Sequence, residues 1–358
     1  MAKVAILASS DNCIAYLCIV RACSGFSHRI NVFMKTAKSL AVLQGGIRIG
    51  SASLADFTEN EKGIKIKTHD GDTVNVRLAD RFGLRFLGID TPEVSMMLPG
   101  ETRFKSLSNV GWDTLFTSGN WKKGMNLSSA LLADLEKRAG DGTGVAANHA
   151  RYARKAKISL EEIISEDIRA SGVSAEKFGL FMSFGLEFLD GYGRLLCYLN
   201  SARENFSDPV TARAVTRWSY NERQLLAGWA LPYFIWPNVQ PFLNKRPFDE
   251  ENASPDGFWK IIRAAGKLQD ARSNVAQARM QGSGVYNPDD PLRIMPFELR
   301  LISRGKAPDR YVIDLANPDS AEILHPEDYY SIACPEDRLY VPSEYVSVFK
   351  LAGWKIKK

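Results

Sequence analysis

Two short acidic turns are the residues of this sequence that can do chemistry together. The first reads Asp-Gly-Asp-Thr at residues 70–73, and the second reads Asp-Thr-Pro-Glu at residues 90–93. Carboxylates gathered in a small volume repel one another unless a cation neutralises them, so Asp72 and Asp90 point to a metal ion with oxygen ligands. Thr91 precedes a proline and is therefore held in an extended conformation, which suits a backbone carbonyl ligand beside Asp90.

Short strands must position these two turns. Apolar and polar residues alternate over residues 64–66 and again over residues 74–78, a pattern typical of half-buried strands. A third strand follows and carries Arg85. Because Arg85 and Asp90 lie five positions apart, a straight strand would send their side chains to opposite faces. Gly88 offers a bend that brings both side chains to one site.

Together with a third motif, these turns resemble the staphylococcal nuclease family. That family's pattern reads Asp-Gly-Asp-Thr, then Arg-x-x-x-x-Asp-[Thr/Ala]-Pro-Glu, then Asp-x-Tyr-Gly-Arg, and residues 190–194 supply the third part. Residues 221–230 resemble the family's asparagine-glutamate helix, and residues 276–286 resemble its closing helix, with Tyr286 in place of tryptophan. The similarity covers residues 62–287 with interruptions. Asp-Gly alone is a common hairpin turn, but three motifs in order at the family spacing form a specific signal.

The resemblance implies an α+β fold that is mainly β, a five-stranded OB-fold-like barrel with three core helices. Residues 146–168 form an amphipathic pattern that predicts a helix, residues 178–189 return to strand character, and a further helix is expected to begin near Ser219. We expect this domain to span residues 61–287. It carries a large insertion near residues 95–145 and a smaller one near residues 203–218.

Two extensions flank the expected barrel domain. Residues 1–60 are expected to be a disordered or loosely packed N-terminal extension, or a degenerate targeting segment. Residues 288–358 are expected to be a C-terminal accessory β-rich module, with strands over residues 310–315 and 345–356.

The resemblance also assigns roles to the site residues. Asp72, Asp90 and the Thr91 carbonyl would hold Ca²⁺, with waters and a substrate phosphate completing its coordination shell. Arg85 and Arg194 would clamp the phosphate, because guanidinium groups match phosphate oxygens and stabilise the charge on five-coordinate phosphorus.

Glu93 is the candidate general base, which would accept the proton of the attacking water or only orient that water. Structural alternatives stay open for each part of the site. The Asp-Gly pairs can serve a turn alone. The arginines can form salt bridges with the aspartates, and Glu93 can be a further partner of the arginines.

Six other residues are candidates for contacts with the substrate: Asp70, Tyr192, Tyr233, Trp236, Lys122 and Lys123. Tyr192 can equally be a tyrosine that packs a turn. Tyr233 opens an aromatic segment that resembles one in the family but is one residue shorter, so that Ile235 stands where a second tyrosine would be. Lys122 and Lys123 follow a tryptophan in the large insertion. They could grip phosphates beside a stacked base, or they could solvate the surface while the tryptophans build a satellite core.

Composition fits this reading without proving it. The 358 residues carry a formal net charge of +5, which is compatible with a polyanionic partner, and five scattered cysteines do not make a disulfide scaffold. We therefore expect a calcium-dependent nuclease that hydrolyses DNA and RNA with little sequence preference. By resemblance it would cut the P–O5′ bond and leave 3′-phosphate ends. The alternative is a non-catalytic nucleic-acid-binding module of the same fold.

The expected partners are single-stranded or frayed DNA and RNA. We expect a monomer, and the sequence indicates no protein partner. The first apolar stretch is interrupted by polar residues and is too short for a stable membrane span. Localisation stays open, because the lack of a clean signal peptide favours the cytoplasm while a calcium requirement favours a secreted or periplasmic enzyme.

Overall fold

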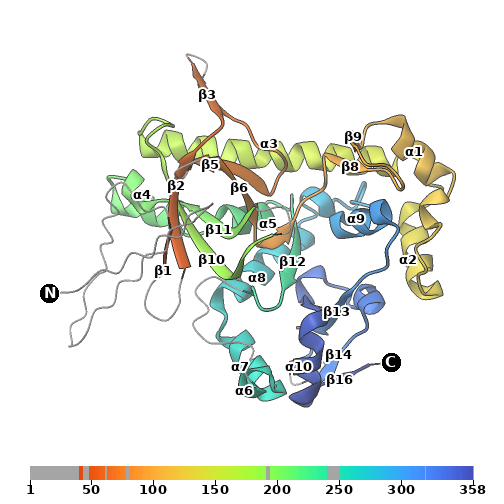
Figure 1. Cartoon of the computed structure of the whole chain (residues 1–358). Helices are drawn as coiled ribbons and strands as arrows, with labels where there is room; N and C mark the ends of the chain where they lie inside the picture. The colour runs from red at the N-terminus through yellow and green to blue at the C-terminus, as the bar shows by residue number, and fades with distance from the viewer. Residues whose placement is uncertain are drawn as a thin grey trace, which may run out of the picture.

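The structure is a computed structural model, and it describes residues 40–42, 48–60, 63–77, 81–190, 194–239, 250–318 and 320–357. Five strands close into a barrel (Figure 1): β2 (Arg48–Leu54), β5 (Thr73–Arg77), β6 (Arg81–Phe86), β10 (Gly179–Leu189) and β11 (Leu195–Ser201). The sheet order is β2-β10-β11-β6-β5, and β5 closes the barrel by pairing with β2. β6 and β11 run parallel, whereas the other neighbours are antiparallel. This mixed barrel confirms the expected OB-fold-like α+β fold.

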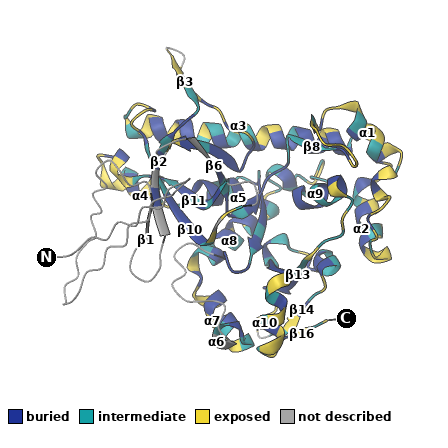
Figure 2. Cartoon of the chain, in the orientation of Figure 1, coloured by how far each residue is buried: buried dark blue, intermediate teal, exposed yellow. Residues whose placement is uncertain are grey.

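The barrel begins earlier in the chain than the sequence indicates. β2 lies inside the expected N-terminal extension, and β1 (Leu40–Val42) pairs with its outer edge. The rest of that extension, residues 1–39 and 43–47, lies outside the described residues. Between β2 and β5, the hairpin of β3 (Phe57–Asn60) and β4 (Gly63–Ile66) projects from the barrel, and β3 is largely exposed (Figure 2).

Apolar side chains fill the barrel in the alternating pattern expected for half-buried strands. Along β11 every second residue is buried, beginning with Leu195, Cys197 and Leu199. These side chains belong to a core cluster that also contains Val76 of β5 and Leu84 of β6. The barrel is therefore a packed scaffold, and its ends and loops carry the polar residues.

Three helices pack on the barrel, as expected: α3 (Val145–Ser171), α5 (Tyr220–Leu226) and α8 (Gly266–Met280). α3 runs across the barrel in Figure 1 and buries Leu160 and Ile164 in the barrel core. The acidic turn lies directly against α3, because a Cβ on Gly71 would come within 2.6 Å of the Ala156 Cβ. α5 begins with a capping box in which Ser219 and Glu222 bond each other's backbone N–H.

The C-terminal segment is joined to the barrel domain through a second sheet. Its strand order is β13 (Arg310–Asp314), β15 (Arg338–Pro342), β12 (Leu231–Ile235) and β7 (Gly88–Asp90). The strand expected over residues 310–315 is therefore confirmed as β13. The strand expected over residues 345–356 is wrong, since that stretch contains the helix α10 (Val346–Leu351) before the two-residue strand β16 (Lys355–Ile356).

The large insertion folds into its own elements, β8 (Ser95–Met97), β9 (Phe104–Ser106), α1 (Val110–Thr117), η1 (Asn120–Lys122) and α2 (Ser129–Ala139). It shares a second hydrophobic core with α9 (Pro296–Arg304) of the C-terminal segment. Trp112 and Trp121 lie in this core, as do Phe297 and Ile302 from α9. We call the insertion and α9 together the accessory lobe, since these distant parts of the sequence pack as one unit.

The remaining short elements are η2 (Arg203–Asn205) and α4 (Pro209–Val215) in the smaller expected insertion, then α6 (Glu250–Ala253), α7 (Pro255–Ala264), η3 (Gly284–Tyr286), β14 (Glu322–Ile323), η4 (Pro326–Ser331), η5 (Pro335–Asp337) and η6 (Ser343–Tyr345). Among the residues described, none of the helices combines the length and the apolar composition that crossing a membrane requires.

Candidate active site

The two acidic turns meet over Arg85, as the sequence predicts. Arg85 donates from Nη1 to Asp72 Oδ1 at 3.1 Å and from Nη2 to Asp90 Oδ1 at 2.9 Å. Both carboxylates are 1% exposed. The predicted bend at Gly88 is confirmed, because β6 ends at Phe86 and β7 begins at Gly88, whose φ of 75° suits a glycine. This bend turns Asp90 back toward the face of the strand that carries Arg85.

Thr91 and Asp70 complete the oxygen-rich side of the cluster. The Thr91 N–H donates to Asp72 Oδ2 at 3.2 Å, which holds the two turns together. Within the described part of the chain, Asp70 Oδ1 and Thr91 Oγ1 are buried and have no hydrogen-bond partner. Buried oxygens without a donor are costly, so these two atoms mark a place where a cation or ordered water belongs.

Glu93 is held by an arginine that the sequence did not suggest. Arg300 of α9 donates from Nη1 to Glu93 Oε1 at 2.7 Å and to Asp90 Oδ1 at 2.8 Å, while its Nη2 donates to Asp90 Oδ2 at 2.8 Å. Arg300 lies 207 residues beyond Glu93 and outside the stretch that resembles the nuclease family. No local pattern could have found it, because its role depends on where α9 packs.

His149 of α3 fixes the backbone of the same turn. Its Nε2 accepts the Glu93 N–H at 2.8 Å, so its proton sits on Nδ1, which faces the Ile294 carbonyl oxygen at 3.2 Å. Burial lowers the pKa of His149 to about 4, which keeps the ring neutral at neutral pH. His149 therefore ties the Glu93 turn to both α3 and the C-terminal segment.

The carboxylates of this cluster have perturbed pKa values. Burial raises the pKa of Asp72 to about 7, with Asp70 and Asp90 adding to the rise and Arg85 opposing it. Burial also raises the pKa of Glu93, although Arg300 and Arg85 lower it in part. Four acidic side chains thus face two guanidinium groups, an excess of two negative charges that one divalent cation would balance.

The donor set fits a hard cation such as Ca²⁺. Asp72 and Asp90 offer carboxylate oxygens, and the Thr91 carbonyl belongs to the same turn as Asp90. The described residues contain no group of three or more His, Cys, Asp or Glu side chains arranged to hold a metal. The protein ligands would therefore be few, and water and substrate oxygens would have to supply the rest.

Arg194 lies beside the strand that carries Arg85. It stands just before β11, which pairs in parallel with β6, and its Cγ would be 3.4 Å from a Cβ placed on Gly83. Gly83 and Arg85 are two residues apart on β6 and share a face, so the Arg194 side chain runs along the face that carries Arg85. Arg194 Nε donates to Asp190 Oδ2 at 2.7 Å. Tyr192, in the same turn, lies outside the described residues.

Two other candidate substrate contacts, Tyr233 and Trp236, differ in whether they lie near the acidic cluster. Tyr233 is close to the cluster, with its ring stacked on Phe297 at 5.6 Å and the Arg300 guanidinium 5.9 Å from the ring centre. Trp236 is 1% exposed in the apolar core, so the predicted contact with substrate is wrong, because a base cannot reach its face.

The two lysines of the insertion lie on its exposed surface. Lys122 forms an ion pair with Glu136 at 2.7 Å, and Lys123 is exposed beside it. The tryptophan that precedes them is buried, which supports the satellite core over a base-stacking platform.

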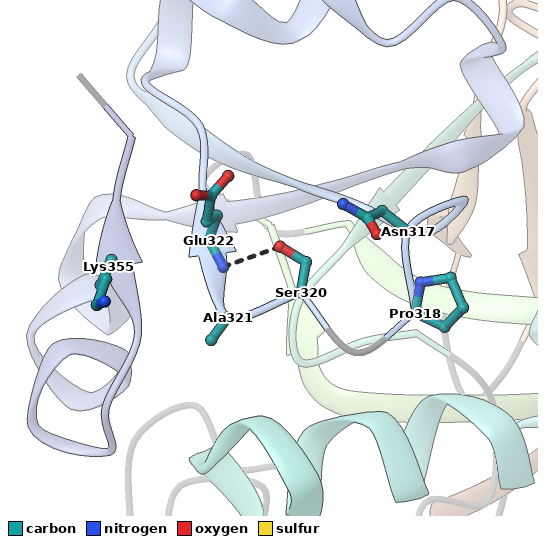
Figure 3. Close-up of a pocket in the computed structure, with 6 residues that line it drawn as sticks. All are labelled: Asn317, Pro318, Ser320, Ala321, Glu322 and Lys355. Carbon is teal, nitrogen blue, oxygen red and sulfur yellow. Dashed lines mark hydrogen bonds between the residues drawn. The ribbon is translucent and has the colours of Figure 1, made fainter.

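A surface pocket of about 480 Å³ lies elsewhere, in the C-terminal segment (Figure 3). It is lined by Asn317, Pro318, Ser320, Ala321, Glu322 and Lys355. In this pocket Ser320 Oγ accepts the backbone N–H of Glu322 at 3.1 Å. None of these lining residues belongs to the acidic cluster, so this pocket and the candidate chemistry are separate features.

Comparison with known proteins gives one curated relative of this chain. The chain is 28% identical over 210 residues to Endonuclease YhcR of Bacillus subtilis (strain 168). The matched residues make up 58% of this chain but 13% of that protein, so the chain spans a small part of its relative's length. No protein-family model matches the chain.

Proposed function

We propose that the protein is a calcium-dependent nuclease that hydrolyses phosphodiester bonds in DNA and RNA. The observation that carries this proposal is the meeting of Asp72, Asp90, Arg85 and Glu93 in one buried ion-pair network at the barrel. The similarity to a protein named as an endonuclease supports the same reaction class. The resemblance of the motifs to the staphylococcal nuclease family supports the finer assignment.

Arg85 and Glu93 would act on opposite sides of the reacting phosphorus. Arg85, with Arg194 along the same face of β6, would bind the phosphate oxygens and stabilise the charge that develops in an in-line displacement. Glu93 Oε1 is bonded to Arg300, and the described residues donate no hydrogen bond to Oε2. Oε2 would therefore be the atom that accepts a proton from the attacking water, and burial, which raises the pKa of Glu93, would favour that role.

A bound Ca²⁺ would neutralise the cluster and polarise the phosphate. Asp72, Asp90 and the Thr91 carbonyl would hold it. In the chain itself, Arg85 fixes both carboxylates in advance by donating to Asp72 and Asp90, and the Thr91 N–H adds a second bond to Asp72. We expect single-stranded or frayed DNA and RNA to be the best substrates, and the products to carry 3′-phosphate ends.

The alternative is a non-catalytic nucleic-acid-binding module, and one observation favours it. Arg300 forms ion pairs with both Asp90 and Glu93, which is typical of a network that serves structure alone. Against it, every acidic and arginine position of the family pattern in the described residues is kept: Asp72, Arg85, Asp90, Glu93 and Arg194.

The test is cleavage of labelled single-stranded DNA and RNA by wild type and by Glu93→Gln, with Ca²⁺, Mg²⁺ or a chelator. Loss of a general base should lower the rate about 10²- to 10⁴-fold. The matched control is Glu101→Gln, because Glu101 is 38% exposed and, among the described residues, forms its ion pair with Lys105 of the same insertion. Salt-sensitive binding without cleavage in any metal would replace the nuclease with the binding module.

A further inference from the structure

Arg300 reaches the acidic cluster from a helix that belongs to the accessory lobe. Its side chain is 18% exposed, and its guanidinium forms a two-point bond with Asp90 and a further bond with Glu93. A guanidinium held at two points by one carboxylate has little freedom to rotate. The third bond therefore places Glu93 Oε1 at a fixed position relative to Asp90.

The insertion fixes α9 in turn. Glu298, two residues before Arg300, accepts Nη1 of Arg138 at 2.8 Å and Nη2 at 2.6 Å, and Arg138 comes from α2 of the insertion. Glu298 also accepts the Tyr329 hydroxyl and the N–H of Met295. The residue before Glu298, Phe297, is buried in the core that the insertion shares with α9.

Without Arg300, the Glu93 carboxylate would lack its one ion-pair partner among the described residues. It would lie buried beside Asp90 and repel it. His149 holds only the backbone of Glu93, so it cannot orient the carboxylate. Arg85 is bonded to Asp72 and Asp90 rather than to Glu93. Orientation of the Glu93 side chain thus depends on Arg300.

We propose that Arg300 is a positioning residue for the hydrolysis, which holds the Glu93 carboxylate against Asp90 and so makes the accessory lobe part of the catalytic unit. This inference rests on the proposed nuclease function. It assigns a third arginine to the site, supplied by a segment outside the barrel. A barrel domain without the accessory lobe would then keep its metal ligands but lose the alignment of its base.

Arg300 should support hydrolysis but weaken the binding of calcium. Its positive charge bonds both oxygens of Asp90, which is also a ligand in the proposed cation site. Removing that charge should strengthen the attraction of the cluster for Ca²⁺. Arg300→Gln should therefore hydrolyse strands more slowly and yet bind calcium more tightly, a pair of changes that a disrupted site cannot produce.

The experiment uses the full chain and six proteins: wild type, Arg300→Gln, Arg300→Lys, Glu93→Gln, the double variant of Arg300→Gln with Glu93→Gln, and the control Arg304→Gln. Arg304 is exposed at the end of α9, so its replacement removes the same charge from the same helix without touching the cluster. The readouts are kcat and KM on a short single strand, calcium affinity by calorimetry without substrate, and thermal unfolding.

We expect Arg300→Gln to lower kcat about 10²-fold with a small change in KM, because a misaligned base slows the chemical step. Calcium affinity should rise about tenfold from the lost charge. Arg300→Lys should restore wild-type calcium affinity but only part of kcat, since one ammonium cannot bridge two carboxylates at once. In the Glu93→Gln background, Arg300→Gln should change kcat less than about threefold, since its partner is already gone.

The outcomes that overturn the proposal are distinct. If Arg300→Gln lowers kcat by the same factor in the wild-type and the Glu93→Gln backgrounds, Arg300 does not act through Glu93. A rise in KM alone would make it a substrate contact. Weaker calcium binding together with a fall in unfolding temperature in both Arg300 variants would make its role structural. A wild type that cleaves nothing removes the nuclease function itself, whereas an active wild type matched by Arg300→Gln removes only the positioning role.

Discussion

Replacing Arg138 by methionine should loosen α9 from the insertion, and the structure gives the size of the effect. Glu298 is 2% exposed and Arg138 is 24% exposed, and they are joined by two hydrogen bonds. Removing one partner of a buried pair costs about 3–5 kcal/mol, because a charge is left buried without its counter-ion. Arg138 is partly exposed, and Glu298 keeps its bonds to Tyr329 and Met295. We therefore expect a loss of about 2–3 kcal/mol, at or just below the lower end of that range.

The assay is urea denaturation of wild type, Arg138→Met, Glu298→Gln and the double variant. The double variant should lose less than the sum of the single ones, because it removes the buried charge of Glu298 together with its partner. The matched control is Lys122→Met, whose partner Glu136 lies on the same helix as Arg138 but whose ion pair is 39% and 44% exposed at its two ends. An exposed pair of this kind contributes about 0–1 kcal/mol.

The effect should also depend on pH with a definite sign. Burial alone would raise the pKa of Glu298, but Arg138 and the hydrogen bonds lower it, and the net pKa lies below its ordinary value. A lowered carboxyl pKa stabilises the fold above the unfolded value, and this stability is lost as the pH falls through the folded value. The gap between wild type and Arg138→Met should therefore close in acid below about pH 4. A gap no larger than that of Lys122→Met, or one that does not change with pH, would refute the reasoning.

Three further predictions follow from the site. His149→Phe should lower kcat about tenfold by releasing the Glu93 N–H, whereas His149→Gln, which keeps an acceptor, should stay near wild type in the same cleavage assay. With a chelator present, the unfolding temperature of wild type should fall relative to that of Asp72→Asn as the pH rises from about 5 to about 8. The reason is that a pKa of about 7, raised above the unfolded value, stabilises the fold only while Asp72 is protonated. Added Ca²⁺ should reverse this loss. Gly71→Ala should cost about 1–3 kcal/mol in urea denaturation by forcing the acidic turn off Ala156, and Ala156→Gly should restore part of it.

The parts of the molecule that follow local rules could be predicted from the sequence. The acidic turns and the bend at Gly88 can be predicted, because Asp-Gly pairs, prolines and a glycine in a strand each determine the backbone conformation over a few residues. The spacing of apolar residues predicts the helix over residues 146–168, which is α3 in the structure. What these patterns fix is a short piece of chain and the side chains it presents.

The parts that depend on tertiary packing could not be predicted. Arg300 and His149 reach Glu93 from α9 and α3, and no spacing links their positions in the sequence. The burial of Trp236 could not be predicted, because an aromatic residue near a turn gives the same local sequence pattern whether its side chain faces solvent or lies in a core. The C-terminal stretch around Val346 alternates like a strand, yet it forms a helix whose apolar side chains pack into the barrel core.

The placement of Glu93 explains why the accessory lobe bears on catalysis at all. Asp72 and Arg85 belong to the barrel and Asp90 ends β7 of the second sheet, but Glu93 lies after Asp90, where the chain enters β8 of the insertion. The proposed metal ligands are therefore anchored by the two sheets, whereas the proposed base lies on the segment that follows them. Two side chains from other elements hold Glu93, His149 through its backbone and Arg300 through its carboxylate. Substitutions in the lobe core, such as Phe297→Ala, should consequently reduce kcat without weakening calcium binding, because they loosen Arg300 from Glu93 and Asp90 and leave the ligands in place.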